Sequence, residues 1–207
     1  MPAPTFAAHV LTSPERRNAI VQTVANMAAS DWKEAPRIHV ELSEKAPSRV
    51  RRAAAYGQML LVAVNEATDY TLLLEDDITV NRHLRHNLCS WEPLARGQLV
   101  LGSLCSSEVA HLPGYHPDGG EEYSFAAEIR TVLGAQALIL SRGFLNYAAA
   151  HWEDGGAGQS RRLVRLAKGF GNMHYHAPSL VKHVGADFIP GAQRPDARDF
   201  DREWRAG

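Results

Sequence analysis

The feature that most constrains the fold is a largely apolar run, residues 70–74, which stops abruptly at three consecutive acidic residues, Glu75, Asp76 and Asp77. A continuous run of this kind is typical of a parallel strand that is covered on both faces. Two strand–helix pairs precede the run, so this part of the chain predicts a βαβαβ unit. Sheets of this kind bind ligands at the carboxyl ends of their strands, which is where the acidic residues fall.

The rest of the chain also alternates between strand-like and helix-like segments. Strands are predicted at 5–11, 37–42, 99–104, 131–141 and within 173–184, and helices at 14–30, 48–67, 82–91, 142–151 and 159–168. The expected fold class is therefore α/β: one Rossmann-like domain with a mixed, mostly parallel central sheet and helices on both faces. We expect this domain to span residues 1–190, followed by a weakly folded tail at 191–207 that is rich in Asp, Arg and Pro.

Length and charge exclude several classes of protein. The 207 residues suit one domain. Lys and Arg number 22 against 23 Asp and Glu, a net charge of −1, which argues against a nucleic-acid-coating surface or a polybasic membrane anchor. No apolar run approaches the ~20 residues of a transmembrane segment, and no basic region precedes the first apolar stretch, so a cytoplasmic protein is expected. Whether two copies form a homodimer is left open.

Three adjacent carboxylates at the end of a buried strand repel one another, and burial makes it costly to ionise all of them. A divalent cation with oxygen ligands is the usual remedy, and Mg²⁺ or Mn²⁺ held in this way keeps open positions that substrate phosphates fill. The acidic residues therefore favour a site for a metal ion and a diphosphate. A simple solvated acidic turn is the alternative.

Three motifs in order suggest a family. LLLEDDITVN at 72–81 resembles the acidic signature of glycosyltransferases of the GT-A fold, especially the lipopolysaccharide-type enzymes of family 25. HVLTSPERR at 9–17 is similar to their first strand and turn, and APSLVKHVGADF at 177–188 looks like their late segment, in which a histidine completes the metal site. The resemblance covers about residues 5–188 and implies a GT-A domain.

The resemblance implies a role for each matching residue. Asp77 would bind the cation, His183 would be its second protein ligand, and Glu75 and Asp76 would contact ribose, sugar or a water molecule on the metal. Imidazole beside carboxylates suits Mn²⁺ better than Mg²⁺. A structural histidine that only forms hydrogen bonds remains the alternative for His183.

The first turn and the late segment carry further implications. Thr12, Ser13 and Arg16 would line the pocket for the base and the phosphates. The late segment departs from the family pattern, because residues 186–188 read Ala-Asp-Phe where small hydroxyl residues are usual. This departure bears on how the late loop would close over the donor.

An inverting sugar transfer needs a carboxylate as general base within reach of the acceptor hydroxyl. Asp154 is the first candidate and Glu153 the second, because they lie just before a predicted late helix whose dipole favours an acid at its start. The preceding Trp152 is either a platform for a sugar ring or a packing residue. Plain helix-start acids remain the alternative for the two carboxylates.

Two more places are candidates for contact with the donor. Gly134 and Gln136 follow an apolar run, and the small residues there would let backbone amides approach the donor sugar; a strand bulge is the alternative. Arg52 begins the second helix, where a cation opposes the helix dipole. It would face the diphosphate, or belong to a solvated helix face.

The sequence thus favours a metal-dependent glycosyltransferase that moves a sugar from a nucleoside diphosphate sugar, preferably a UDP-sugar, with Mn²⁺ or Mg²⁺. The acceptor is open: a glycan, a lipid-linked sugar or a small molecule. A nucleotide-binding relative without catalysis is the main alternative. A haloacid dehalogenase-type hydrolase would need its nucleophile Asp77 on the first strand, and a receiver domain would need an acidic pair after that strand.

Overall fold

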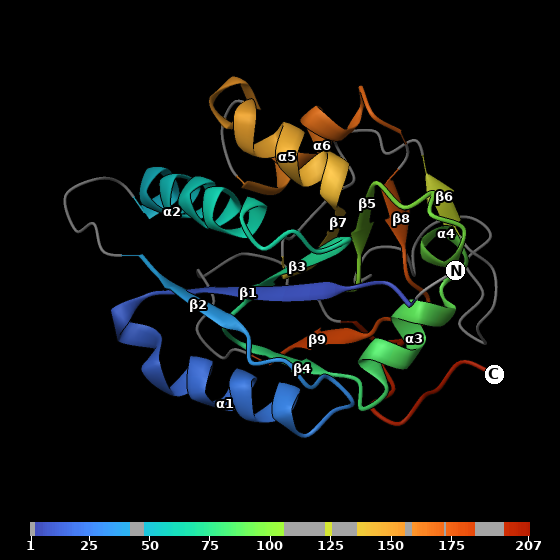
Figure 1. The fold of residues 1–207 in the computed structure, drawn as a ribbon. Coiled ribbons are helices and arrows are strands. Elements are labelled where there is room, and N and C mark those ends of the chain that lie inside the picture. Colours follow the sequence, from blue (N-terminus) through green and yellow to red (C-terminus); the bar gives the residue numbers. More distant parts are fainter. Residues whose placement is uncertain are drawn as a thin grey trace.

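The computed structural model of the protein describes residues 3–41, 48–105, 123–125, 136–155, 159–171, 173–184 and 197–207. These residues form a central sheet with helices on both faces (Figure 1). The predicted fold class, a single α/β Rossmann-like domain, is therefore confirmed.

The central sheet mixes strand directions. Its order is β2 (Arg37–Val40), β1 (Phe6–Thr12), β3 (Tyr70–Glu75), β7 (Ala137–Ser141), β5 (Leu101–Ser103), β8 (Met173–Tyr175) and β6 (Tyr123–Phe125). The pairs β1–β2, β1–β3 and β5–β8 are parallel, and the pairs that involve β7 or β6 are antiparallel. Among the described strands, β7 and β6 therefore run against the others. A separate antiparallel pair is formed by β4 (Ile78–Val80) and β9 (Val181–His183).

Alternate residues of the buried strand β3 serve two separate cores. Leu72 and Leu74 belong to one core, on the side of α1 (Arg17–Ala28) and the β4–β9 pair, while Leu73 belongs to the other. Both sets are at most 1% exposed. This double coverage explains why the segment is continuously apolar in sequence instead of alternating.

Each face of the sheet has its own helices. On the α1 side, the turn η1 (Pro14–Arg16) leads into α1, and α3 (Leu84–Ser90) and α4 (Glu92–Ala95) add buried residues such as Leu84 and Leu94. On the other side lie α2 (Ser48–Val64), α5 (Arg142–Ala150), the short helix η3 (Trp152–Gly155) and α6 (Gln159–Ala167) (Figure 1). Met59 and Phe144 are fully buried between α2 and α5.

The C-terminal residues 197–207 are part of the first core. Ala197 is fully buried, and Phe200 and Trp204 pack against the cluster. The amide of buried Asn81 donates 2.8 Å hydrogen bonds to the carbonyls of Asp201 and Trp204. The expectation of a weakly folded tail is wrong for these residues, because buried side chains satisfy the backbone of a polar segment. Residues 191–196 lie outside the described part.

Most predicted helices and strands are present with shifted ends. Within the described ranges, the structure adds short elements that the sequence did not indicate, namely β4, α4, β6 and η3. The segment at 173–184 holds two strands, β8 and β9, where one was expected. Residues 106–122 and the first five residues of the predicted strand at 131–141 lie outside the described residues.

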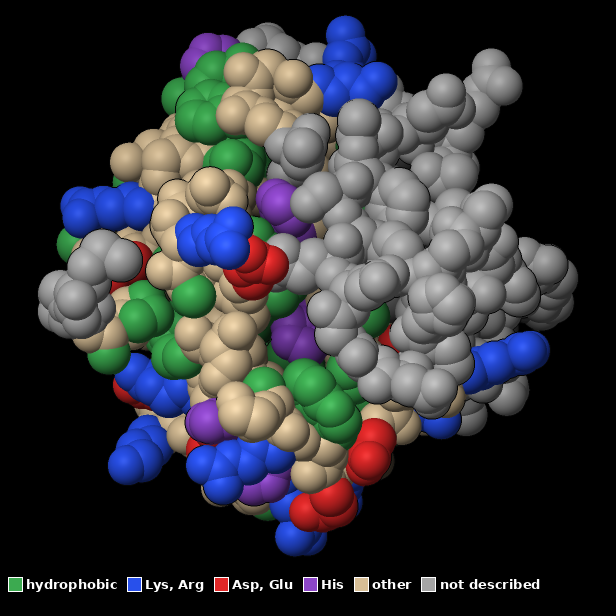
Figure 2. Space-filling model, turned by 90° about the vertical axis from the view of Figure 1, so that its right-hand side faces the viewer, with side chains coloured by type: hydrophobic (Ala, Val, Ile, Leu, Met, Phe, Trp, Pro, Cys, Tyr) green, Lys and Arg blue, Asp and Glu red, His purple; other side chains and the backbone are tan. Residues whose placement is uncertain are grey.

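The surface carries charges of both signs, as the net charge of −1 leads us to expect. On the face shown in Figure 2, described Lys and Arg side chains are interspersed with Asp and Glu. Within the described ranges, no helix combines the length and apolar character that crossing a membrane requires.

Three histidines with lowered pKa values should make the stability of the protein depend on pH. Burial lowers the pKa of His9, His39 and His176 to about 4, from an ordinary value of 6.5; His9 Nδ1 and His39 Nε2 lie 2.9 Å apart. Between these pH values the unfolded chain binds more protons than the folded one, so stability falls as pH falls. We expect urea unfolding at pH 5 to give a free energy about 2 kcal/mol or more below that at pH 7.

The variant His39→Gln provides the comparison for this expectation. Because one titrating histidine is removed, the loss of stability between pH 7 and pH 5 should be smaller than in the unchanged chain. An equal or greater loss in the variant would contradict the assignment of the pH dependence to these histidines.

Candidate functional site

The ends of β1 and β3 bring the first turn to the acidic residues. These strands are parallel with Leu11 opposite Glu75, so Thr12 and Asp76 follow at the same edge. The Thr12 hydroxyl donates to Asp76 Oδ2 at 2.5 Å, and both side chains are buried. Arg16, in the turn after β1, reaches the same edge, with its Nε 3.2 Å from Asp76 Oδ1 and its Nη2 donating to Asp77 Oδ2.

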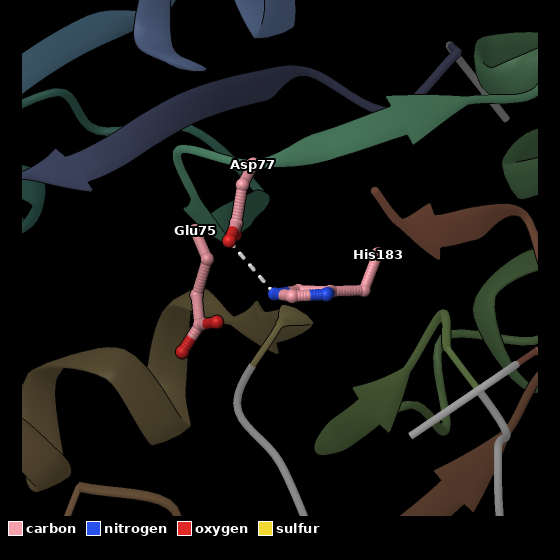
Figure 3. A group of neighbouring side chains, drawn as sticks. All are labelled: Glu75, Asp77 and His183. Atoms are coloured by element: carbon pink, nitrogen blue, oxygen red, sulfur yellow. Dashed lines mark ion pairs between the residues drawn. The ribbon is translucent and has the colours of Figure 1, made fainter. Parts of the chain in front are cut away.

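The short strand β4 brings a distant histidine to the same place. β4 pairs with β9 so that Ile78 lies opposite His183, and the amide of Val184 donates to the carbonyl of Asp77 at 2.8 Å. As a result, His183 Nε2 lies 2.8 Å from Asp77 Oδ2, and the two side chains point toward each other (Figure 3). Potential ligand atoms of Glu75, Asp77 and His183 all lie within 4.8 Å of one another.

The three acids respond differently to their surroundings. Burial raises the pKa of Glu75 and of Asp76. Burial alone would raise the pKa of Asp77 as well, but the hydrogen bond from His183 and the charges of His183 and Arg16 outweigh it and lower that pKa. The hydrogen bond with Asp77 in turn raises the pKa of His183. The site therefore has Asp77 at its centre, between Arg16 and His183, which both favour its ionised form.

The residues of this cluster fit a divalent cation. Asp77 Oδ1 is buried and has no hydrogen-bond partner among the residues that the structure describes, although a buried carboxylate oxygen normally has one. Two carboxylates and one imidazole form a mixed oxygen and nitrogen donor set, which suits Mn²⁺. A cation there would supply a partner for the unpaired oxygen and reduce the repulsion between Glu75 and Asp77.

A pocket of about 470 Å³ adjoins the cluster, a size within the range of small-ligand sites. The residues that line it come from the strand ends, the first turn, α2 and α6: Leu11, Thr12, Ser13, Glu15, Arg16, Glu41, Arg51, Arg52, Asp76 and Gln159. The structure thus brings together Thr12, Ser13, Arg16, Arg52 and Asp76, which were expected, in separate roles, to contact the donor.

Three arginines line the pocket together with three acids, Glu15, Glu41 and Asp76. Arg52 Nη2 lies 2.9 Å from Glu75 Oε1, and Arg51 Nε lies 3.0 Å from Glu41 Oε1. Arg52 Nε is buried and makes no hydrogen bond within the described part of the chain. Each arginine is paired with an acid, so an anion that enters the pocket would compete with a carboxylate for the guanidinium group.

The structure describes only some of the residues that were expected near the donor sugar and the acceptor. Gln136 precedes β7, where its carbonyl accepts a 2.9 Å hydrogen bond from the amide of Glu75. Glu153 is 88% exposed and lies 3.7 Å from Arg162. Asp154 lies in η3, but its side chain is outside the described part, as are Gly134 and residues 186–188.

Trp152 is a packing residue. It is 4% exposed, its ring stacks on Tyr56 with the ring centroids 5.5 Å apart, and its Nε1 donates to the carbonyl of Ala53 at 2.9 Å. Gly57 allows this contact, because a Cβ there would come within 2.5 Å of the indole. Of the two interpretations that the sequence left open, the structure supports packing.

Thr23, which the sequence analysis did not single out, holds the acidic turn. It is fully buried on α1, and its hydroxyl donates to the carbonyl of Asp76 at 2.7 Å and accepts from the amide of Ile78 at 3.1 Å. A polar residue on the buried face of an amphipathic helix was the available signal. Glu15, Glu41 and Gln159 were also missed as pocket residues, because nothing in their local sequence indicates a pocket.

Comparisons with known proteins bear on the fold. No family model matches the sequence, and no curated protein matches it significantly. One similar solved structure is a glycosyltransferase involved in the glycosylation of the major capsid of PBCV-1, with 13% identity and a TM-score of 0.48 over 84% of this chain and 83% of that one. Another is A197 from STIV, with 11% identity and a TM-score of 0.50 over 89% and 86%. The likeness to A197 concerns the fold alone.

The role of Thr23 can be tested with a matched pair of variants. Thr23→Val keeps the shape but leaves the Asp76 carbonyl and the Ile78 amide unpaired, so we expect unfolding by urea to show a loss of about 1–3 kcal/mol. Thr23→Ser keeps the hydroxyl and should lose clearly less. Equal losses in the two variants would mean that the hydroxyl does not support the turn.

Proposed function

We propose that the protein is a metal-dependent glycosyltransferase that transfers a sugar from a nucleoside diphosphate sugar, preferably a UDP-sugar. The observation that carries the proposal is the cluster of Glu75, Asp77 and His183 beside an arginine-lined pocket at the carboxyl ends of β1 and β3. The resemblance to the GT-A family implied that the acidic turn and the late histidine meet, and His183 Nε2 lies 2.8 Å from Asp77 Oδ2.

The residues have distinct roles in the proposal. Asp77 and His183 hold Mn²⁺ or Mg²⁺, and Glu75 binds the same cation or a water molecule on it. The cation, when bound, neutralises charge that grows on the departing diphosphate. Thr12, Ser13 and Arg52 bind the nucleotide part of the donor from the pocket wall, where guanidinium groups suit phosphate oxygens.

The acceptor side of the site is assigned to η3 and the start of α6. Gln159 lines the pocket, and η3 immediately precedes α6 in the chain. Asp154 is proposed as the general base that takes the proton of the acceptor hydroxyl, with Glu153 as the second candidate. A base in this position favours transfer with inversion. The acceptor, a glycan, a lipid-linked sugar or a small molecule, is bound from this side or by a partner subunit.

Calorimetry with UDP tests the binding part of the proposal. We expect UDP to bind in the presence of Mn²⁺ and to bind at least about tenfold more weakly without it, because a cation held by Asp77 and His183 would attract the negatively charged phosphates. Asp77→Asn should remove the metal dependence. Asp199→Asn, which changes an acid outside the cluster, should leave UDP binding unchanged. The proposal would be contradicted if the affinity for UDP changed neither on addition of Mn²⁺ nor in Asp77→Asn.

Turnover distinguishes an enzyme from a protein that only binds nucleotides. Hydrolysis of UDP- and GDP-sugars with Mn²⁺ should release the diphosphate slowly even without an acceptor, and Asp154→Asn should reduce turnover by about 10²-fold or more with little change in UDP affinity. Tight binding of UDP and Mn²⁺ without turnover of any donor would instead identify a nucleotide-binding protein.

A further inference from the structure

The guanidinium group of Arg16 lies where positive charge is most needed in the metal cluster. Its Nη2 donates to Asp77 Oδ2, the same oxygen that lies 2.8 Å from His183 Nε2, and its Nε lies 3.2 Å from Asp76 Oδ1. Its side chain is 27% exposed, whereas the side chains of Asp76 and Asp77 are 1% and 4% exposed. Arg16 is therefore the charge partner of two buried acids, and the same residue also lines the pocket.

A divalent cation and Arg16 cannot both stay beside Asp77 at low cost. A cation held by Asp77 and His183 would lie close to the guanidinium group, because Arg16 and His183 contact the same oxygen of Asp77. The repulsion of like charges at short range corresponds to about tenfold in Kd or more even when it is strongly screened. Removing Arg16 without replacement would leave Asp76 and Asp77 as uncompensated buried charges.

Arg16 also lines the pocket, so its guanidinium group has a second place to lie, away from the acids. Arg16, Arg51 and Arg52 line it together with the hydroxyl groups of Thr12 and Ser13. An anion such as a diphosphate in this pocket would attract a guanidinium group that a cation had displaced from the acids.

We propose that Arg16 is a positioning residue that takes the place of the cation when the site is empty and turns to the phosphate groups of the nucleotide when the cation binds. The inference rests on the proposed function and deepens it. In the absence of nucleotide, Arg16 lowers the affinity for the cation, and with nucleotide it adds to binding. Arg16 thereby couples the two binding events, so that each ligand strengthens the other by more than direct contact between them provides.

Titration of Mn²⁺ alone, without nucleotide, tests the inference. The titrations are run at pH 8 by electron paramagnetic resonance of free Mn²⁺, on the unchanged chain, Arg16→Gln and Arg17→Gln. We expect Arg16→Gln to bind Mn²⁺ at least about fivefold more tightly. Arg17→Gln removes the same charge from the next residue of the chain, which is exposed and does not line the pocket, and it should change the Kd by less than about twofold. Arg16→Met is a second variant in case Arg16→Gln folds poorly.

Titration of UDP at saturating Mn²⁺ completes the test. Here Arg16→Gln should bind UDP about tenfold more weakly than the unchanged chain. A role limited to folding would weaken both ligands and would not strengthen Mn²⁺ binding.

The outcomes separate the inference from the proposed function. Equal Kd values for Mn²⁺ in Arg16→Gln and the unchanged chain would overturn the inference and leave the proposed metal site intact. Weaker binding of Mn²⁺ to Arg16→Gln would also overturn it. If neither protein binds Mn²⁺, the proposed function fails, and the inference fails with it.

Discussion

Carboxylates that are taken out of water need positive charge beside them, and the edge of the sheet where β1 and β3 end is organised around this need. Because β3 is buried on both faces, its acidic residues Glu75, Asp76 and Asp77 follow one another at the end of the strand, beside the core. Each acid then has its own partner: Arg52 for Glu75, Arg16 for Asp76, and His183 with Arg16 for Asp77. Exchange of some of these partners for a divalent cation is the chemical basis of the proposed function.

Two antiparallel pairings bring distant parts of the chain to this edge. β7 runs against β3 and places the carbonyl of Gln136 on the amide of Glu75. β9 pairs with β4 immediately after the acidic turn and thereby delivers His183. The hydroxyl of Thr23 on α1 forms hydrogen bonds with the backbone of this turn. Contacts with β7, α1 and the β4–β9 pair thus restrict the backbone of the acidic residues.

Much of this arrangement could be predicted from the sequence, for physical reasons. The unbroken apolar run of β3 indicates double coverage, and because parallel strands end at one edge, the turn after β1 was expected at the same edge of the sheet as the acidic residues. The contact of Thr12 with Asp76 comes from the structure. The approach of His183 depended on resemblance, because β4 and β9 have three residues each and too little pattern to be recognised. The pairing of Arg16 with the acids could not be read from sequence, since a long side chain can turn either to the acids or to the pocket. The packing of 197–207 was hidden because its partners, Asn81 and Asn87, are buried polar residues in a distant segment.

The direct contact of His183 with the cation is the central claim, and pulsed electron paramagnetic resonance of bound Mn²⁺ tests it most directly. Coordination by an imidazole gives a ¹⁴N coupling in the electron spin echo, which oxygen ligands do not give. The account predicts this coupling in the unchanged chain and in His174→Gln, and its loss in His183→Gln. Absence of the coupling in the unchanged chain, or its persistence in His183→Gln, would contradict the account.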